Sequence, residues 1–402
     1  MQTSQRLKDL PMSAIRKLTP YATKALADGV KIYKLNIGDP DIKTPECMLD
    51  VLRKWDTNPI RYAAAIGEPE FLKALHQYYL KLGFNFIAQE NIISTIGGSE
   101  AIFMALFSVA QAGDEILIFE PFFANYAITA GILGVKMVPI PTTIENGFHL
   151  PPKDVIEKLF TTKTKAIIYC NPSNPTGTVY TKEEVEMLVE IAKEKNIFLM
   201  CDEVYREFLF VKRPFVSILD YFKQIPEQAI LIDSLSKRYS LCGGRLGILI
   251  TLNNELRDGF AKIANSRLSG GLIDQMMASK MTDVGKEYTD NVQKEYRKRR
   301  DIVYKLLKEI SGVVVSEPEG AFYIIAKLPV KNSEEFCIWM LKEFRDNNET
   351  VMMAPAAGFY LTPGKGVDEV RIAYVLEVPK LIRAITLLKK GLETYTAKGK
   401  AE

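Results

Sequence analysis

Histidine, paired cysteine and long apolar runs are scarce in this chain, and each shortage excludes a class of protein. The 402 residues contain two histidines, His76 and His149, which argues against a Ser-His-Asp triad and against a metal centre with several histidine ligands. The five cysteines form no Cys-x-x-Cys pair, and their odd number fits a reducing compartment better than a disulfide framework. The sequence therefore predicts a cytoplasmic protein without a metal site.

The chain also lacks any apolar stretch long enough to cross a membrane. Its longest apolar runs, such as residues 101–107, fall far short of the roughly 20 residues that a spanning helix needs. The N-terminal segment lacks the apolar core of a signal peptide. The net charge of +3 is too small for a nucleic-acid-binding surface, and the one basic run, residues 296–300, is expected on a solvated helix face. We therefore expect neither a membrane nor a nucleic-acid partner.

The middle of the chain alternates short apolar runs with helical patterns. The apolar runs are rich in Ile, Val and Phe and are expected as strands, at residues 92–95, 115–119, 135–140, 166–170, 197–201, 229–233 and 247–251. One of the helical patterns between them begins after Thr181, which forms a capping box with Glu184. This alternation predicts an α/β fold, with a mostly parallel sheet sandwiched by helices.

The two ends of the chain show a different pattern. They predict helices and short strands, with helices at 13–28 (Pro20 within it or at a break), 282–310, 333–345 and 378–394, and strands at 313–316 and 321–326. A chain of this length suits two domains. We expect a large domain at residues 44–285 and a smaller α+β domain built from residues 1–43 and 286–402.

The most informative segment is Ser-Leu-Ser-Lys-Arg-Tyr-Ser-Leu-Cys-Gly-Gly-Arg-Leu-Gly, residues 234–247. A lysine that forms a Schiff base needs its amine beside an aldehyde, and the phosphate of pyridoxal phosphate needs hydroxyls and a permanent cation. Lys237 offers the amine, and Ser234, Ser236 and Arg245 offer the phosphate contacts. The pattern Ser-x-Ser-Lys, then Gly-x-Arg-x-Gly, resembles the lysine segment of the class I/II aminotransferases, which are fold-type I pyridoxal phosphate enzymes.

The resemblance extends to two segments that follow expected strands. Asp202-Glu-Val-Tyr205 comes after an apolar run, and the carboxyl ends of strands are where open α/β sheets bind ligands. The resemblance implies that Asp202 keeps the cofactor's ring nitrogen protonated and that the Tyr205 hydroxyl bonds the phenolic oxygen of the ring. Residues 171–177 match the family's Asn-Pro-x-Asn-Pro-Thr-Gly, which implies that the Asn174 amide reaches the same oxygen.

A glycine-rich turn is expected to hold the phosphate. Gly-Gly-Ser-Glu, residues 97–100, joins an expected strand to an apolar helix, and the N-terminus of a helix favours an anion. The phosphate is expected on the main chain of Gly98, Ser99 and Glu100, with the Glu100 side chain turned away. The resemblance further implies that Phe123 stacks on the cofactor ring.

The substrate and partner contacts are implied by the resemblance. Arg371, in a Val-Arg-Ile segment, lies where the family's arginine clamps the α-carboxylate of the substrate, a task that suits a bidentate guanidinium. Gly38 lies in a Leu-x-x-Gly-x-Pro-Asp segment whose glycine approaches the same carboxylate, and Asn174 is assigned to the substrate as well. Tyr62 matches the tyrosine that crosses to the phosphate in the partner subunit, which implies a homodimer.

The chain departs from the family pattern in two places. Gly243-Gly244-Arg245 replaces the commoner Gly-Trp-Arg and removes a bulky packing residue. Arg267 and Ser269 lie where many relatives carry a stretch of small Thr and Ser residues. Two roles stay open there, namely a bond from Ser269 to the partner's phosphate or an approach of Arg267 to the substrate.

Together these motifs predict an aminotransferase that moves an amino group from an L-amino acid to a 2-oxo acid, by resemblance 2-oxoglutarate. Lys237 is expected to act as general base and acid on the α-proton.

The alternative is a carbon–sulfur β-lyase, or another α-proton-abstracting enzyme of the same fold, because such enzymes use the same cofactor residues. A DNA-binding regulator is not expected, because too few residues precede the first motif for a winged helix. A Rossmann dehydrogenase is not expected, because no strand precedes a Gly-x-Gly-x-x-Gly.

Overall fold

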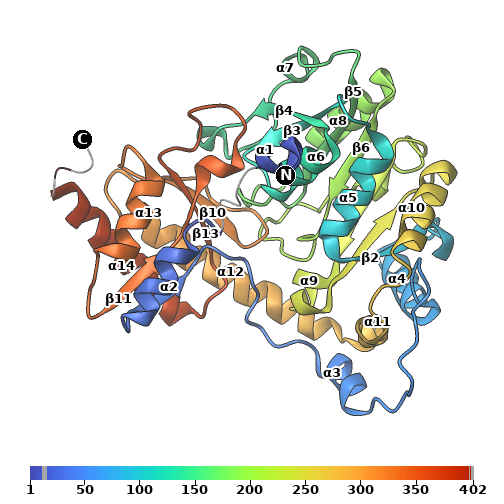
Figure 1. The fold of residues 1–402 in the computed structure, drawn as a ribbon, viewed down its shortest axis with the longest axis horizontal. Coiled ribbons are helices and arrows are strands. Elements are labelled where there is room, and N and C mark those ends of the chain that lie inside the picture. Colours follow the sequence, from blue (N-terminus) through green and yellow to red (C-terminus); the bar gives the residue numbers. More distant parts are fainter. Residues whose placement is uncertain (11–15, 398, 400–402) are drawn as a thin grey trace.

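A seven-stranded sheet forms the centre of the larger part of the molecule (Figure 1). The computed structural model describes residues 1–10, 16–397 and 399. The strands lie in the order β2-β8-β7-β6-β5-β3-β4, with bounds Ile92–Ile96 (β2), Glu115–Glu120 (β3), Lys136–Pro141 (β4), Thr164–Cys170 (β5), Phe198–Asp202 (β6), Ala229–Ser234 (β7) and Leu246–Ile250 (β8). All seven strands expected from the apolar runs are therefore present.

The sheet is mostly parallel, as expected. β8 pairs antiparallel with β2 and β7, whereas the other neighbouring pairs are parallel. Parallel strands are usually buried on both faces, because the crossover helices cover them. Burial along β6 follows this rule, since Leu199 and Cys201 belong to the core on one face and Met200 to the core on the other.

Helices cover both faces of the sheet. One face shares its core with α4 (Pro69–Lys81) and α8 (Lys182–Lys195), and the other with α5 (Gly97–Val109), α6 (Asn125–Leu133) and α10 (Asn254–Ser266). The predicted capping box is confirmed at the start of α8, where the Thr181 hydroxyl accepts the Glu184 N–H and the Glu184 carboxylate accepts the Thr181 N–H. Smaller helices complete this part of the chain, namely α3 (Glu46–Arg53), α7 (Lys153–Glu157), α9 (Leu235–Arg238) and α11 (Leu272–Ala278).

A second part of the molecule is built from both ends of the chain. β1 (Lys31–Lys34) pairs in parallel with β11 (Glu349–Met352), so segments far apart in sequence lie side by side. The other small sheet has the order β12-β13-β10-β9, with bounds Ala354–Pro355, Glu369–Ala373, Tyr323–Lys327 and Val314–Val315.

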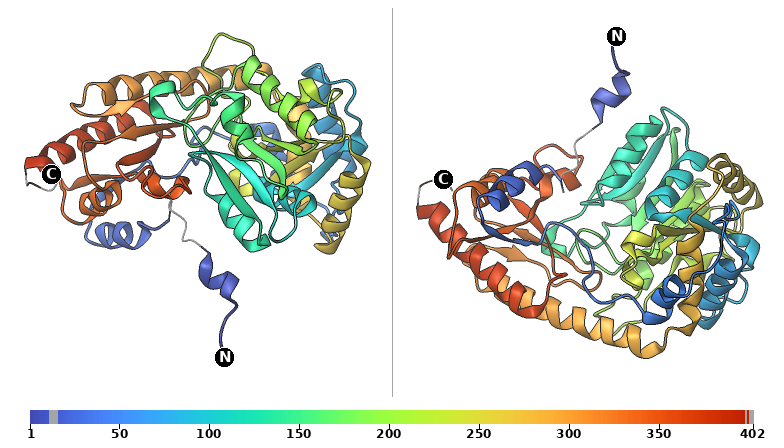
Figure 2. Two further views of the ribbon diagram at one scale, coloured as in Figure 1. Left: turned by 90° about the horizontal axis from the view of Figure 1, so that it is seen from above. Right: turned by 60° about the horizontal axis from the view of Figure 1, so that its bottom comes forward.

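The remaining helices flank these small sheets or lead to them, except α1, which contacts α6. They are α1 (Gln5–Asp9), α2 (Thr19–Ala27), α12 (Lys286–Lys308), α13 (Ser333–Lys342) and α14 (Val378–Ala397). Figure 2 shows α12, in orange, running along the molecule from the large sheet's side to the small sheets. Within the described residues, no helix combines the length and the apolarity that crossing a membrane requires.

Several predicted element ends are wrong: the helix expected at 333–345 ends at Lys342, the helix expected at 378–394 ends at Ala397, and three starts differ for a local reason. The helix expected at 13–28 begins as α2 at Thr19 and has Pro20 in its first turn, where a proline needs no N–H, while residues 13–15 lie outside the described part. The long helix expected from 282 begins at Lys286, because residues 279–283 form a separate 3-10 helix. The strand expected from 321 begins at Tyr323, because Ala321 has a left-handed φ of +54°.

Candidate active site

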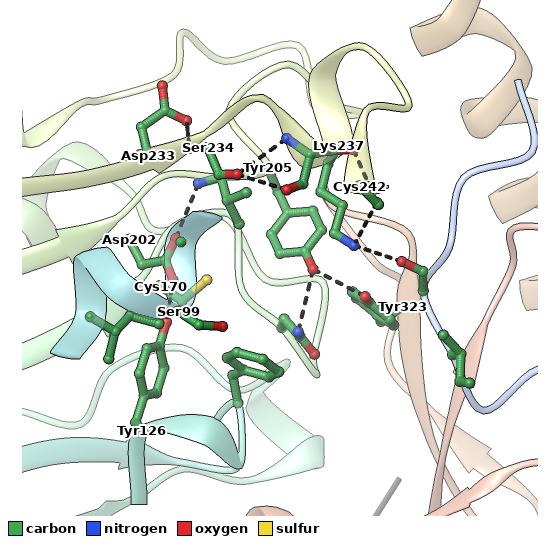
Figure 3. Close-up of a pocket in the computed structure, with 18 of the residues that line it drawn as sticks. Ser99, Tyr126, Cys170, Asp202, Tyr205, Asp233, Ser234, Lys237, Cys242 and Tyr323 are labelled. Carbon is green, nitrogen blue, oxygen red and sulfur yellow. Dashed lines mark hydrogen bonds between the residues drawn. The ribbon is translucent and has the colours of Figure 1, made fainter. Parts of the chain in front are cut away.

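A cavity of about 230 Å³ lies where β5, β6 and β7 end. Residues of the N-terminal segment, β10 and β13 line it from the opposite side (Figure 3). It brings together all the site residues expected from the sequence except Glu100 and Tyr62, namely Gly38, Gly98, Ser99, Phe123, Asn174, Asp202, Tyr205, Ser234, Ser236, Lys237, Arg245 and Arg371. Segments separated by more than half the chain therefore meet at one site.

Lys237 is carried into this cavity by the short helix α9, which follows β7 directly. Ser234 caps that helix, because its Oγ accepts the Ser236 N–H at 3.1 Å and donates to the Leu246 carbonyl at 2.7 Å. The Lys237 Nζ donates to the Gly38 carbonyl at 2.8 Å and lies 3.4 Å from the Cys242 Sγ (Figure 3). The amine is thus held by uncharged partners.

Asp202 ends β6 and is buried. One carboxylate oxygen accepts the Tyr126 hydroxyl at 2.7 Å, and the other accepts the Val204 N–H at 3.2 Å. Burial raises the pKa of Asp202 to about 6, against the opposing effect of these hydrogen bonds. The ion pairs of the described residues include none with Asp202, so the buried carboxylate can take a cationic ligand.

A chain of hydrogen bonds leads from Tyr205 to Arg371. The Tyr205 hydroxyl lies 3.0 Å from the Tyr323 hydroxyl and accepts the Asn174 amide at 3.4 Å. The other end of that amide, Oδ1, accepts Arg371 Nη1 at 3.0 Å, and Arg371 Nη2 donates to the Asn36 carbonyl at 2.6 Å. Asn174 is therefore fixed between the tyrosine and the arginine.

Arg371 is a buried cation without an acidic partner among the described residues. Its side chain is 1% exposed, its Nε has no hydrogen-bond partner, and the rings of Tyr323 and Phe359 lie 4.5 and 4.9 Å from its Cζ. Burial lowers the pKa of Arg371. A desolvated guanidinium in this position favours an anionic ligand such as a carboxylate.

The start of α5 provides an anion-binding corner of the cavity. Gly97 has φ +73°, and a Cβ built on it would lie 2.4 Å from Arg245 Nη2, so only glycine brings the turn this close to the guanidinium. Gly98 and Ser99 follow in the first turn of the helix and line the cavity with Arg245 and Ser236. Main-chain N–H groups, a hydroxyl and a guanidinium together suit a phosphate.

The comparisons with known proteins agree with this geometry. The family described as aminotransferase class I and II matches residues 30–382. The chain belongs to this family. It is 31% identical to an aspartate aminotransferase from Pyrococcus horikoshii, with 97% of each chain covered, and 32% identical to aromatic-amino-acid aminotransferase 2 from Thermococcus litoralis, with 98% and 99% covered. The solved structure of an aspartate aminotransferase from Thermotoga maritima matches with a TM-score of 0.87 at 27% identity, covering 97% of this chain and 100% of that one.

This aminotransferase therefore has the fold-type I architecture and depends on pyridoxal phosphate for amino-group transfer, as the sequence predicted. Aminotransferases related to it use amino acids and 2-oxo acids and are generally dimeric. The residues of the cavity fit the cofactor. Asp202 offers a buried carboxylate to a protonated ring nitrogen, and the start of α5 with Arg245 offers a phosphate corner.

Glu100 and Arg267 lie outside the cavity of the aminotransferase and contact each other. Arg267 Nε lies 2.9 Å from Glu100 Oε1, and its Nη2 donates to the Ser94 carbonyl at 3.0 Å. The other Glu100 oxygen accepts the Ile96 N–H at 2.5 Å. The Glu100 side chain is thus engaged at the helix start, and Arg267 is engaged by that carboxylate.

Tyr62 and Ser269 also lie outside the cavity. Tyr62 is 81% exposed, and Ile60 and Leu268 are exposed as well. Ser269 is tied within its own chain, because its Oγ accepts the Ala63 N–H at 2.8 Å.

Sequence reasoning did not name eight residues that line the cavity, namely Ile37, Ile102, Tyr126, Cys170, Val204, Asp233, Cys242 and Tyr323. Three of them lay within matched segments and could have been found there. Ile37 directly precedes Gly38, Val204 directly precedes Tyr205, and Cys242 lies between Lys237 and Arg245. Tyr126 had no such signal, because an apolar helix start with a tyrosine is typical of any core helix.

Proposed function

We propose that Lys237 is the residue of this aminotransferase that binds pyridoxal phosphate covalently and moves the substrate's α-proton as general base and acid. The observation that carries the proposal is the presence of the Lys237 amine, the buried Asp202 carboxylate and the unpaired Arg371 guanidinium around one cavity. When bound, the cofactor supplies an electron sink for the carbanion formed at the α-carbon.

The other residues of the cavity are proposed to bind and orient. Asp202 holds a proton at the ring nitrogen of the cofactor, and Tyr205 and Asn174 hydrogen-bond its phenolic oxygen. Phe123 stacks on the ring. Arg371, with Gly38 and Asn174, holds the α-carboxylate of the substrate. The phosphate contacts are assigned to the main chain of Gly98, Ser99 and Glu100, the Ser234 and Ser236 hydroxyls, and Arg245.

The acceptor is proposed to be 2-oxoglutarate. Two relatives are named for aspartate and for aromatic amino acids, so both kinds of amino donor are candidates here. Arg267 is a poor candidate for a second carboxylate clamp, because Glu100 already neutralises it.

A donor panel tests the proposed function. The loaded enzyme is mixed with single amino acids, and the 2-oxo acid released and the amino group retained on the protein are both measured. We expect one equivalent of each per active site, and then turnover when 2-oxoglutarate is added. Release of pyruvate and ammonia from cystathionine in place of amino-group transfer would contradict the proposal.

The enzyme is further proposed to be a cytoplasmic homodimer in which Tyr62 reaches the phosphate bound to the partner subunit. The exposure of Tyr62 and the free state of all five thiols support this. The proposed large domain covers residues 44–285 and contains the seven-stranded sheet, and the proposed small domain covers residues 1–43 and 286–402 and contains the smaller sheets.

A further inference from the structure

A thiol lies beside the amine of Lys237. Cys242 lines the same cavity, and its Sγ lies 3.4 Å from the Lys237 Nζ (Figure 3). The same Sγ lies 3.1 Å from the Ser236 carbonyl oxygen. The backbone turn that leads from α9 to Arg245 holds Cys242 in this place.

The neighbours of Cys242 fix the direction of its hydrogen bond with Lys237. The Ser236 carbonyl and the Asp39 carboxylate can only accept, so the single thiol proton is directed to one of these oxygens, and the sulfur accepts from Lys237. The Gly38 carbonyl, at 2.8 Å, is a second acceptor for the same amine. The neutral amine nitrogen of a lysine has four tetrahedral directions. One is the bond to Cε, and its two N–H bonds point to these two acceptors. The fourth direction is that of the lone pair, which can form a new bond.

The thiol acts on Lys237 as a neutral group. Burial raises the pKa of Cys242, nearby Lys237 lowers it, and nearby Asp39 raises it, with a net rise. A thiolate would form an ion pair with the ammonium of Lys237 and favour its protonated form, which is not nucleophilic. A neutral sulfur orients the amine without that effect.

We propose that Cys242 is a positioning residue, whose sulfur and the Gly38 carbonyl together direct the lone pair of the Lys237 amine toward the aldehyde carbon of pyridoxal phosphate. This inference rests on the proposed function of Lys237. In the step concerned, the amine nitrogen bonds the aldehyde carbon and gives up its two protons, and the aldehyde oxygen leaves with them as water. Orientation of this kind acts on the rate of bond formation.

The test uses apoprotein of the wild type and of the variants Cys242→Ala and Cys242→Ser. Cys47→Ala is the matched control, because Cys47 is a half-buried thiol outside the cavity whose Sγ hydrogen-bonds the Lys280 carbonyl. Each apoprotein is mixed with pyridoxal phosphate, and the rate at which the lysine–cofactor absorbance appears is measured. Binding of pyridoxine 5′-phosphate, which has no aldehyde, is measured in parallel.

We expect bond formation to be about fivefold slower in Cys242→Ala, the effect of losing one hydrogen bond, with unchanged affinity for pyridoxine 5′-phosphate. Cys242→Ser should return to within about twofold of the wild type, because a hydroxyl also donates to Ser236 and accepts from Lys237. Cys47→Ala should match the wild type.

Two results would overturn the inference. One is a wild-type rate of bond formation in Cys242→Ala. The other is a loss of pyridoxine 5′-phosphate affinity that matches the loss of rate, because the thiol would then act by shaping the cofactor pocket and not by orienting the Lys237 amine. A wild-type apoprotein that forms no bond at Lys237 would instead refute the proposed function, so the two failures are distinguishable.

Discussion

Lys237, Asp202 and Arg371 face one cavity, and the ion pairs of the described residues include none of the three. Several other buried charges of this aminotransferase are paired, as Arg238 is with Asp233 at 2.7 Å, whereas the buried Glu120 accepts only main-chain N–H groups. Since an unpaired buried charge destabilises a fold, the buried Asp202 and Arg371 are best explained by the charges of a ligand.

Arg371→Leu should separate substrate binding from folding. We expect KM for the amino donor to rise about 100-fold, the effect of leaving a buried carboxylate without its cation. Thermal stability of the apoprotein should stay the same or increase, because the variant removes an unpaired buried charge. Arg257→Leu, which changes a surface arginine of α10, is the control. An unchanged KM in Arg371→Leu would contradict the assignment.

Asp202→Asn should change how the stability of the apoprotein depends on pH. The folded-state pKa of Asp202 is about 6 against an ordinary 3.8, so the folded state binds the proton more tightly. This proton stabilises the folded apoprotein fully below about pH 4, and the stabilisation is lost as the pH rises through about 6. The free energy of unfolding falls by about 3 kcal/mol over this range. In the variant this change disappears, so its unfolding free energy should exceed that of the wild type at neutral pH and match it in acid.

Urea unfolding of both apoproteins at several pH values measures that difference. Parallel curves for the wild type and Asp202→Asn would show that Asp202 titrates normally. With pyridoxal phosphate bound, the variant should lose turnover, because a neutral amide cannot hold the ring nitrogen protonated.

Among the elements, the start of α5 has a backbone conformation that only glycine adopts without strain. Gly97→Ala should weaken pyridoxal phosphate binding and lower the unfolding free energy by about 1–2 kcal/mol, because φ is +73° and the new Cβ would meet the Arg245 guanidinium. Gly98→Ala is the matched stability control, since its Cβ would meet only the Ser234 Cβ, at 3.7 Å. Equal stabilities for the two variants would contradict the steric argument.

The strands were predictable from the sequence, whereas some element ends were not. Strands buried on both faces read as continuous apolar runs, which is why β3, β5, β6 and β7 stand out. The start of α12 is different, because residues 279–283 satisfy a helical pattern and still form a separate 3-10 turn. A pattern of apolar positions does not distinguish the two.

At the scale of the whole molecule, the motifs predicted residues that line one cavity, and the fold shows which contacts they make there. Gly38 and Tyr323 illustrate this, because a Cβ on Gly38 would lie 1.8 Å from the Tyr323 hydroxyl, so glycine is required by a residue almost three hundred positions away. The pairing of Arg267 with Glu100 is also long-range, since the two residues lie 167 positions apart. Neither contact follows from local propensity or periodicity, since both depend on how the chain folds back on itself.

Tyr62 gives a prediction about the assembled enzyme. If its hydroxyl serves the partner's site, Tyr62→Phe should weaken pyridoxal phosphate binding about fivefold, as expected for one hydrogen bond. A mixture of Tyr62→Phe and Lys237→Ala subunits should then form hybrids with one intact site, and wild-type affinity should return at that site. A hybrid with no intact site would show that Tyr62 acts within its own subunit.

The most direct test of the account is to reduce the loaded enzyme with borohydride and identify the modified residue by peptide mass spectrometry. We expect the cofactor on Lys237, and we expect Lys237→Ala to lose both the label and the visible absorbance of the bound cofactor. The exposed Lys280 serves as the control, so Lys280→Ala should keep both. A label on another lysine, or colour and turnover that persist in Lys237→Ala, would contradict the central claim.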